Sequence, residues 1–228
     1  MPGDEIHLSV ADAYDRWSSA YDAYDNPMVL MAARAVAGMA ALAQGEAVLE
    51  FGCGTGRNLE ALKAAGAARL VGLDLSDGML EQARARDASF ELHRRDMAAA
   101  APFPDASFDL VLFCLTLEHV VDIAAPLRDA RRLLRLLRPG GQAVVIEIHP
   151  FLSLGGLGAH FTLGGETVRM PTVSHRFCDY LNAFAASDLA VRNCREWRPR
   201  DHGDPIPPRL LKHGPDRPYV VEFRLGAA

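Results

Sequence analysis

A glycine at every second position, from Gly52 to Gly56, follows an apolar run that contains the acidic residue Glu50. Glycine suits a turn that takes unusual dihedral angles and brings the backbone close to a bound molecule. A helical pattern begins at Leu59, so the segment predicts a buried strand, a tight turn and a helix whose N-terminus faces a ligand. Taken alone, the turn does not identify that ligand, because dinucleotide-binding folds use similar turns.

Apolar segments alternate with helical patterns on both sides of this turn. Apolar strands that alternate with helices favour a parallel, doubly wound α/β sheet with helices on both faces. Two later strands, at 189–197 and 219–225, are joined by a proline-rich connection, which predicts an antiparallel final pair. The other expected strands are 47–51, 69–74, 89–94, 108–113 and 142–148, and the helices between them are 57–65, 76–86 and 123–137.

Polar residues that could do chemistry lie at the carboxyl ends of five expected strands. In a doubly wound sheet, ligands bind at these ends, near the point where the strand order reverses. We therefore expect residues from five strands to line one crevice. They are Glu50, Asp74, Asp96, the segment 114–119 and the segment 147–149.

An aromatic, amphipathic stretch at residues 9–24 precedes the first strand. Its Tyr14, Trp17 and Tyr21 follow a three-then-four spacing, which places them on one face of a helix. Such a face either packs on the core or forms a lid whose phenol groups close over a ligand, and the sequence leaves both interpretations open. Residues 28–43 predict a second, alanine-rich helix.

The chain of 228 residues is expected to form one domain. We divide it into an N-terminal helical lid at 1–44, a cofactor-binding core at 45–149, a substrate cap at 150–175 and a C-terminal helix and strand pair at 176–228. The cap begins with an apolar, glycine-rich run. It predicts an irregular insertion or a small hairpin over the strand ends.

Composition limits the class of partner and the cellular compartment. The formal net charge of −5 gives no reason to expect a nucleic-acid partner. The four cysteines are scattered without a Cys-x-x-Cys pair, which disfavours a zinc site and a disulfide framework and fits a reducing cytosol. The sequence shows neither signal-peptide features nor an apolar run long enough for a membrane span. We expect a cytoplasmic protein without a bound metal.

An ordered set of motifs resembles the class I S-adenosylmethionine-dependent methyltransferases. The set comprises the acid-x-Gly-x-Gly-x-Gly turn, the acid that ends the second strand, Arg-Asp-Met at 95–97, and the segments 105–111 and 137–141 before the fourth and fifth strands. The N-terminal Tyr-Asp-x-Trp…Tyr-Asp pattern is similar to the type 11 branch, which includes quinone-ring and natural-product methyltransferases. The resemblance covers roughly residues 10–148. It implies a Rossmann-like, seven-stranded, mostly parallel sheet with an antiparallel last strand.

The resemblance also implies S-adenosyl-L-methionine as the cofactor and assigns roles by position. The glycine turn would pass beneath the methionine part, with Glu50 balancing its ammonium group. Asp74 would accept hydrogen bonds from both ribose hydroxyls, because a carboxylate suits this diol and repels the 2′-phosphate of NADP. The expected cofactor-binding residues are Tyr14, Tyr21, Glu50, Gly52, Gly54, Asn58, Asp74, Leu75, Met79, Asp96, Met97, Cys114 and Leu115.

Histidines near the strand ends are the first candidates for proton transfer. His119 and His149 follow the fourth and fifth strands, and a pKa near neutrality would fit a general base. The alternative for each is a structural role, with the ring bonded to backbone or to a neighbouring acid. Tyr21 is a further catalytic candidate, because its ring, with that of Tyr14, could cover the cofactor and stabilise the sulfonium. At least one of a second group is expected to contact the substrate: His160, His175, Arg176 and Tyr180.

The sequence therefore predicts methyl transfer to a small, aromatic or hydrophobic molecule. A pocket for such a molecule is expected around residues 151–161, Met170 and Phe177. Carbon, nitrogen and oxygen stay open as the methylated atom, and a homodimer stays open as the assembly. The alternative function is a catalytically inactive cofactor-binding sensor or partner subunit. The Gly-x-Gly-x-Gly spacing disfavours a nicotinamide-dependent reductase.

Overall fold

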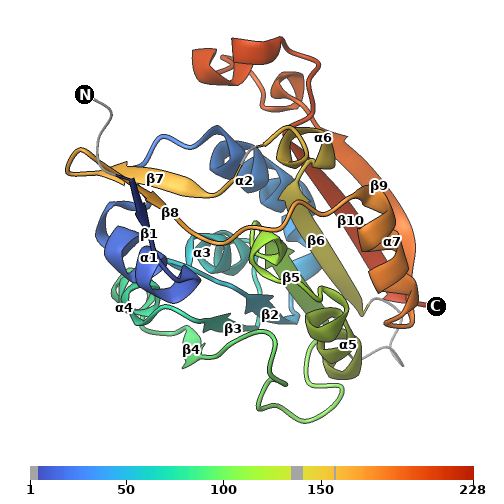
Figure 1. Ribbon diagram of the computed structural model, residues 1–228. Helices are drawn as coiled ribbons and strands as arrows, with labels where there is room; N and C mark the ends of the chain where they lie inside the picture. The colour runs from blue at the N-terminus through green and yellow to red at the C-terminus, as the bar shows by residue number, and fades with distance from the viewer. Residues whose placement is uncertain (1–4, 135–140, 157) are drawn as a thin grey trace.

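A computed structural model describes residues 5–134, 141–156 and 158–228 of the chain. In its seven-stranded central sheet, the spatial order is β4 (Glu91–Arg94), β3 (Arg69–Asp74), β2 (Ala47–Phe51), β5 (Leu110–Cys114), β6 (Gln142–Ile148), β10 (Val220–Ala227) and β9 (Leu189–Trp197) (Figure 1). The pairs from β4 to β6 are parallel, whereas β10 runs antiparallel to both of its neighbours. The predicted doubly wound sheet is thereby confirmed. The point at which the order of the strands along the sheet reverses lies between the parallel strands β2 and β5.

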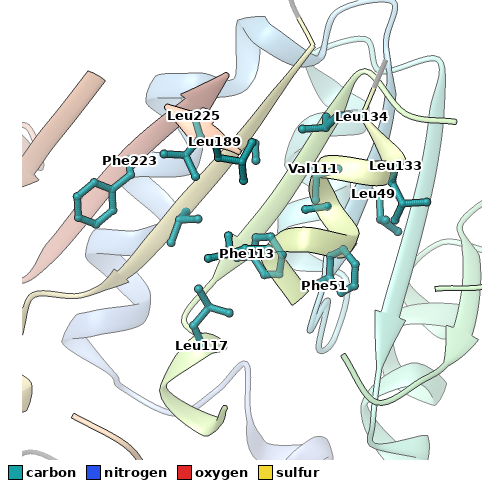
Figure 2. Close-up of a cluster of buried hydrophobic side chains, with 14 of the residues drawn as sticks. Leu49, Phe51, Val111, Phe113, Leu117, Leu133, Leu134, Leu189, Phe223 and Leu225 are labelled. Carbon is teal, nitrogen blue, oxygen red and sulfur yellow. The ribbon is translucent and has the colours of Figure 1, made fainter. Parts of the chain in front are cut away.

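Helices cover both faces of this sheet. One face packs against α5 (Ala124–Leu133) and α7 (Phe177–Ala185), and the other against α2 (Pro27–Met39), α3 (Arg57–Ala64) and α4 (Asp77–Arg86). Figure 2 shows part of the first layer, where Phe51 of β2 and Phe113 of β5 stack with ring centroids 4.8 Å apart. Every residue of β2 and β5 is buried, as expected for central strands whose two faces are both covered.

Two expected helices are shorter in the structure. The aromatic stretch forms α1 (Val10–Trp17), which Ser9 caps by accepting from the backbone N–H of Asp12, followed by a single 3₁₀ turn, η1 (Ser18–Ala20). The helix expected at 123–137 corresponds to α5, and residues 135–137 lie outside the described part of the chain. The other expected strands and helices are present with small shifts at their ends.

Helix α1 is held against the N-terminus of α4 by one carboxylate. Asp15 Oδ1 accepts hydrogen bonds from Ser76 Oγ at 2.5 Å and from the backbone N–H of Gly78 at 2.9 Å. Ser76 also caps α4 by accepting from the backbone N–H of Met79. Asp22, after η1, accepts from Thr55 Oγ1 at 2.9 Å. The N-terminal segment is therefore anchored directly beside the glycine turn.

A second, three-stranded sheet covers the carboxyl ends of the central strands. It contains β1 (Glu5–His7), β8 (Glu166–Arg169) and β7 (His160–Leu163), with β1 parallel to β8 and β7 antiparallel to it. The hairpin is one of the two forms that the sequence predicts for the cap. Strand β1 is an unexpected addition, so residues 1–44 are not purely helical. Trp17 of α1 stacks on Phe161 of β7, with ring centroids 4.5 Å apart.

The connection between β9 and β10 projects from the edge of the sheet (Figure 1). It contains η4 (Pro199–Asp201) and η5 (Pro208–His213), and Arg34 of α2 donates to the carbonyl of Asp201 at 3.0 Å. The other short elements are η2 (Ala40–Ala43), η3 (Leu117–His119) and α6 (Pro150–Ser153). Every helix in the described ranges is too short or too polar to cross a membrane.

Candidate functional site

The glycine turn after β2 is pressed against the chain that leaves β5. The backbone N–H groups of Gly52 and Cys53 both donate to the carbonyl of Leu73, at 2.7 and 3.0 Å. Gly52 has a φ of +69°, and a Cβ atom there would lie 2.2 Å from Thr116 Oγ1. Gly54 has a φ of +52°, and nothing lies within 4 Å of the position of its Cβ. Gly52 therefore allows close packing, whereas Gly54 leaves space open for a ligand.

Asp74, at the end of β3, joins the glycine turn to the start of α4. Its Oδ2 accepts from the backbone N–H of Gly54 at 2.8 Å, and its Oδ1 accepts from that of Ser76 at 2.9 Å. Burial raises the pKa of Asp74, although these backbone hydrogen bonds lower it. A carboxylate offers about four acceptor sites on its two oxygens, so Asp74 retains capacity to bind a diol.

These elements enclose a first cavity with an empty volume of about 830 Å³. All but two of the predicted cofactor-binding residues line this cavity. They are Tyr14, Tyr21, Gly52, Gly54, Asp74, Leu75, Met79, Asp96, Met97, Cys114 and Leu115.

The two exceptions, Glu50 and Asn58, lie deeper. Asn58 lines a smaller hollow that continues the first cavity past Gly54 and Tyr21. Its side-chain amide donates to Glu50 Oε1 at 2.7 Å. Glu50 is fully buried, and burial raises its pKa to about 8. The structure therefore places Asn58 at the wall and Glu50 behind it.

A second cavity, with an empty volume of about 850 Å³, adjoins the first. The two cavities share Tyr14, Tyr21 and Leu115 as lining residues. The other residues that line the second cavity are Trp17, Tyr24, Asp25, Asn26, Pro27, Met28, Val29, Glu118, Ile148, Gly158, Ala159 and His160.

The walls of this second cavity differ from the predicted substrate pocket. The N-terminal segment supplies most of the lining, and the cap contributes Gly158, Ala159 and His160. Phe151 is 62% exposed on the surface, and Phe177 packs against the core instead. Met170 is buried in the cluster that includes Trp17 and Phe161. Phe151 in α6, Met170 after β8 and Phe177 in α7 therefore do not line this cavity, and their predicted contact with the substrate stays a prediction.

His119 lines the first cavity, with both ring nitrogens engaged. Its Nδ1 lies 2.9 Å from the carbonyl oxygen of Pro171, and its Nε2 lies 2.9 Å from the hydroxyl of Tyr14. A carbonyl only accepts, so Nδ1 carries the proton and the neutral ring accepts from Tyr14 at Nε2. Burial lowers the pKa of His119 and raises that of Tyr14 well above its ordinary value. This geometry makes His119 a neutral group that orients the Tyr14 hydroxyl.

His149, the other predicted base, does not line either cavity. Its Nδ1 accepts from the backbone N–H of Phe151 at 3.2 Å, at the start of α6, and its Nε2 lies 3.0 Å from Glu196 Oε1. Burial lowers its pKa, opposed by the bond to Glu196. The structural alternative, a ring held by backbone and a neighbouring acid, therefore describes His149.

The other predicted site residues also divide into those that line a cavity and those that do not. His175 Nε2 lies within hydrogen-bonding distance of the carbonyls of Leu117 and Val120, at 3.2 and 2.9 Å. Arg176 begins α7, and Tyr180 is buried in the core. In this structure none of His175, Arg176 and Tyr180 lines a cavity described above, whereas His160 does. Tyr21 lines both cavities, and burial raises its pKa to about 12, which keeps its phenol protonated.

Two glutamates within the predicted segments 114–119 and 147–149, to which the sequence analysis assigned no individual role, lie in or contact the segment after β5. Glu147 Oε1 accepts from the backbone N–H groups of Thr116 and Leu117, at 3.0 and 2.8 Å. Glu118, on the same segment, lines the second cavity. Both lie at expected strand ends, so their position was a usable signal. In the described part of the chain, no cluster of three or more His, Cys, Asp or Glu side chains is arranged to hold a metal ion.

Comparison with known proteins shows which class of protein this fold and site resemble. Residues 49–145 match a family model of the type 11 branch, described as "Methyltransferase domain". The S-adenosylmethionine-dependent methyltransferase from Mesorhizobium loti superimposes with a TM-score of 0.67 at 26% identity, covering 84% of this chain and 95% of that one. Residues 49–145 are thus similar to a methyltransferase domain, and the fold is similar to that of an S-adenosylmethionine-dependent methyltransferase, as the motifs predict.

Curated relatives match the same part of the chain. Demethylmenaquinone methyltransferase from Clavibacter sepedonicus is 39% identical over 142 residues, covering 60% of this chain and 54% of the relative. The 27-O-demethylrifamycin SV methyltransferase from Amycolatopsis mediterranei is 32% identical over 129 residues, covering 54% of this chain and 46% of the relative. The chain spans about half the length of the curated relatives that it matches.

Proposed function

We propose that this protein transfers a methyl group from S-adenosyl-L-methionine to a small molecule. The observation that carries the proposal is the pair of adjoining cavities, one with a carboxylate at a glycine turn and the other lined by aromatic rings. The first cavity suits a nucleoside with a charged tail. The second would hold the acceptor beside it, across the boundary formed by Tyr14, Tyr21 and Leu115.

The residues of the first cavity fit this cofactor. Asp74 would accept from the ribose hydroxyls, and the space above Gly54 would admit the ligand without a Cβ in the way. Leu75 and Met79 would flank the adenine, with Asp96 accepting from its amine and Met97 packing on the ring. When bound, the cofactor supplies an electrophilic methyl group on a sulfonium.

The protein's own contribution would be orientation and exclusion of water. The buried Tyr14 hydroxyl, fixed by His119, and the Tyr21 ring would close the space between the two cavities. Aromatic faces favour a neighbouring cation, so these rings would favour the sulfonium there. Holding two reactants in a fixed mutual orientation is a large part of catalysis for such a displacement.

A small acceptor is favoured over a nucleic acid by charge as well as by shape. The chain has a formal net charge of −5, and none of the described residues that line the second cavity is Lys or Arg. A phosphate-bearing polymer would need a concentrated basic surface. The relatives named above carry names that refer to demethylmenaquinone and to 27-O-demethylrifamycin SV, which supports a small-molecule acceptor.

Calorimetric titration with S-adenosylhomocysteine tests the cofactor assignment. Asp74→Ala should weaken binding by roughly 1.5–3 kcal/mol, because hydrogen bonds to a charged acceptor are lost. Asp77→Ala is the matched control, since Asp77 lies in the first turn of α4 and its side chain is 58% exposed, facing Arg94. Unchanged affinity in a folded Asp74→Ala variant, or binding of NADH in its place, would refute the assignment. Cofactor binding without methylation of any acceptor would favour the sensor or partner-subunit alternative.

A further inference from the structure

The second cavity contains a carboxylate that has no hydrogen-bond partner among the described residues. Glu118 follows β5, and its side chain is only 14% exposed although it lines the cavity. The Nε2 atom of His119 lies 4.0 Å from Glu118 Oε1, but that nitrogen already accepts from Tyr14 and the ring is neutral. Burial raises the pKa of Glu118 to about 7. A buried carboxylate of this kind is costly unless a ligand compensates it.

The walls around Glu118 are aromatic. Trp17 forms edge contacts with Tyr21 and Tyr24, at centroid distances of 4.8 and 5.2 Å, and Tyr14 lies 6.0 Å from Trp17. All four rings line the cavity. Aromatic faces attract cations, and the attraction grows when the site excludes water. Rings and a carboxylate in one pocket favour a positively charged group.

The other charged groups of the cavity also favour a positively charged ligand. Asp25, the second lining carboxylate, is paired with Arg209 from the β9–β10 connection. His160 Nδ1 lies 2.9 Å from the carbonyl of Gly158, so this nitrogen carries a proton. Among the described residues that line the cavity there is no lysine or arginine. An anionic acceptor would therefore meet two lining carboxylates without a lining cation to pair with.

We propose that the methyl acceptor is an aromatic or hydrophobic amine, bound as its ammonium ion between Glu118 and the tyrosine rings. This inference rests on the proposed function and deepens it, because it selects nitrogen as the methylated atom. The ammonium group donates to the carboxylate of Glu118. The N–H bond then breaks, the proton passes to a Glu118 oxygen, and the electron pair stays on the nitrogen, which becomes a neutral nucleophile.

Three probes of similar shape and different charge test the proposal: 2-phenylethylamine, 2-phenylethanol and phenylacetate. Each is titrated by calorimetry into the protein saturated with S-adenosylhomocysteine. The amine should bind about tenfold more tightly than the alcohol, which corresponds to about 1.4 kcal/mol, and phenylacetate more weakly than either. Glu118→Gln should remove the preference for the amine while the alcohol binds as before. Asp122→Asn removes one exposed negative charge nearby and should leave the preference intact.

The outcomes separate the two proposals. Equal binding of amine and alcohol, no binding of the amine at millimolar concentration, or a preserved amine preference in Glu118→Gln would each overturn the amine assignment, provided S-adenosylhomocysteine still binds. Failure of the wild-type protein to bind S-adenosylhomocysteine would overturn the proposed function itself. Binding of S-adenosylhomocysteine by Glu118→Gln serves as the control that the variant is folded.

Discussion

Glu147→Gln should make the protein more stable at neutral and alkaline pH. Glu147 is fully buried on β6, and its Oε1 accepts from two backbone N–H groups of the segment that carries Glu118 and His119. Its Oε2 has no hydrogen-bond partner among the described residues. Glutamine keeps the accepting oxygen and removes the ionisation, so the fold of this segment should be preserved.

The expected size of the stability difference follows from the pKa of Glu147. Burial raises the pKa of Glu147 from 4.5 to about 8, so between these values the unfolded chain has released a proton that the folded protein retains. The unfolded state binds fewer protons in this window, and the stability of the wild-type protein therefore falls as the pH rises. At about 1.4 kcal/mol per pH unit, the loss from this residue is roughly 3 kcal/mol at pH 7 and roughly 5 kcal/mol above pH 8.

Urea denaturation from pH 5 to pH 8.5 measures this effect. The free energy of unfolding of Glu147→Gln minus that of the wild type should rise with pH by the amount given above. The subtraction cancels the other titrating groups, including Glu50. Glu81→Gln on α4 is the control, because this side chain is on the exposed face of the helix and the same substitution should give a flat difference. If the difference in unfolding free energy between Glu147→Gln and the wild type also stays constant with pH, the conclusion that Glu147 keeps its proton in the folded state is refuted.

Two further predictions concern the glycine turn and the histidine outside the cavities. Gly52→Ala should destabilise the fold, since its Cβ would meet Thr116 Oγ1 at 2.2 Å. Gly54→Ala should stay folded, at a cost of roughly 1–2 kcal/mol for its left-handed backbone. This second variant should lose affinity for S-adenosylhomocysteine. Thermal melts with calorimetry separate these outcomes, and equal behaviour of the two variants would contradict the assignment. His149→Ala should lower stability by roughly 0.5–2 kcal/mol through loss of the cap at Phe151 and leave affinity for S-adenosylhomocysteine within a factor of about two. A large loss of that affinity in a folded variant would place His149 in the site after all.

The local sequence pattern was sufficient to predict the central sheet. Strands such as β2 and β5 are buried on both faces and mostly apolar, and each is followed by turn and helix signals that depend only on neighbouring residues. The same reasoning placed Asp74 and Asp96 correctly, because a strand's carboxyl end is defined by its own sequence. Strand β1 escaped prediction, since three residues carry no period and their partner lies about 160 residues later in the chain.

The roles of the titratable side chains depended on contacts between distant segments. His119 and His149 follow neighbouring strands and look alike in sequence, yet one meets Tyr14 and Pro171 at a cavity and the other meets Glu196 outside both cavities. Glu118 lies next to His119 and differs from an ordinary surface acid because it is mostly buried and lines a cavity that the N-terminal aromatic segment also lines. Hydrogen-bond partners and burial set pKa and reactivity, and neither can be read from adjacent residues.

The amino-acid sequence by itself determined the class of protein: the order of strands and helices, the glycine turn and the acids at the strand ends. Tertiary structure decided which cavity each aromatic residue lines and which histidine reaches the site, and it exposed Glu118 as a carboxylate that lacks a hydrogen-bond partner in the described structure. The physical reason is the separation along the chain over which each kind of interaction acts. Backbone periodicity and turn geometry act over a few residues, whereas the electrostatic environment of a buried side chain is the sum of contacts from every segment packed around it.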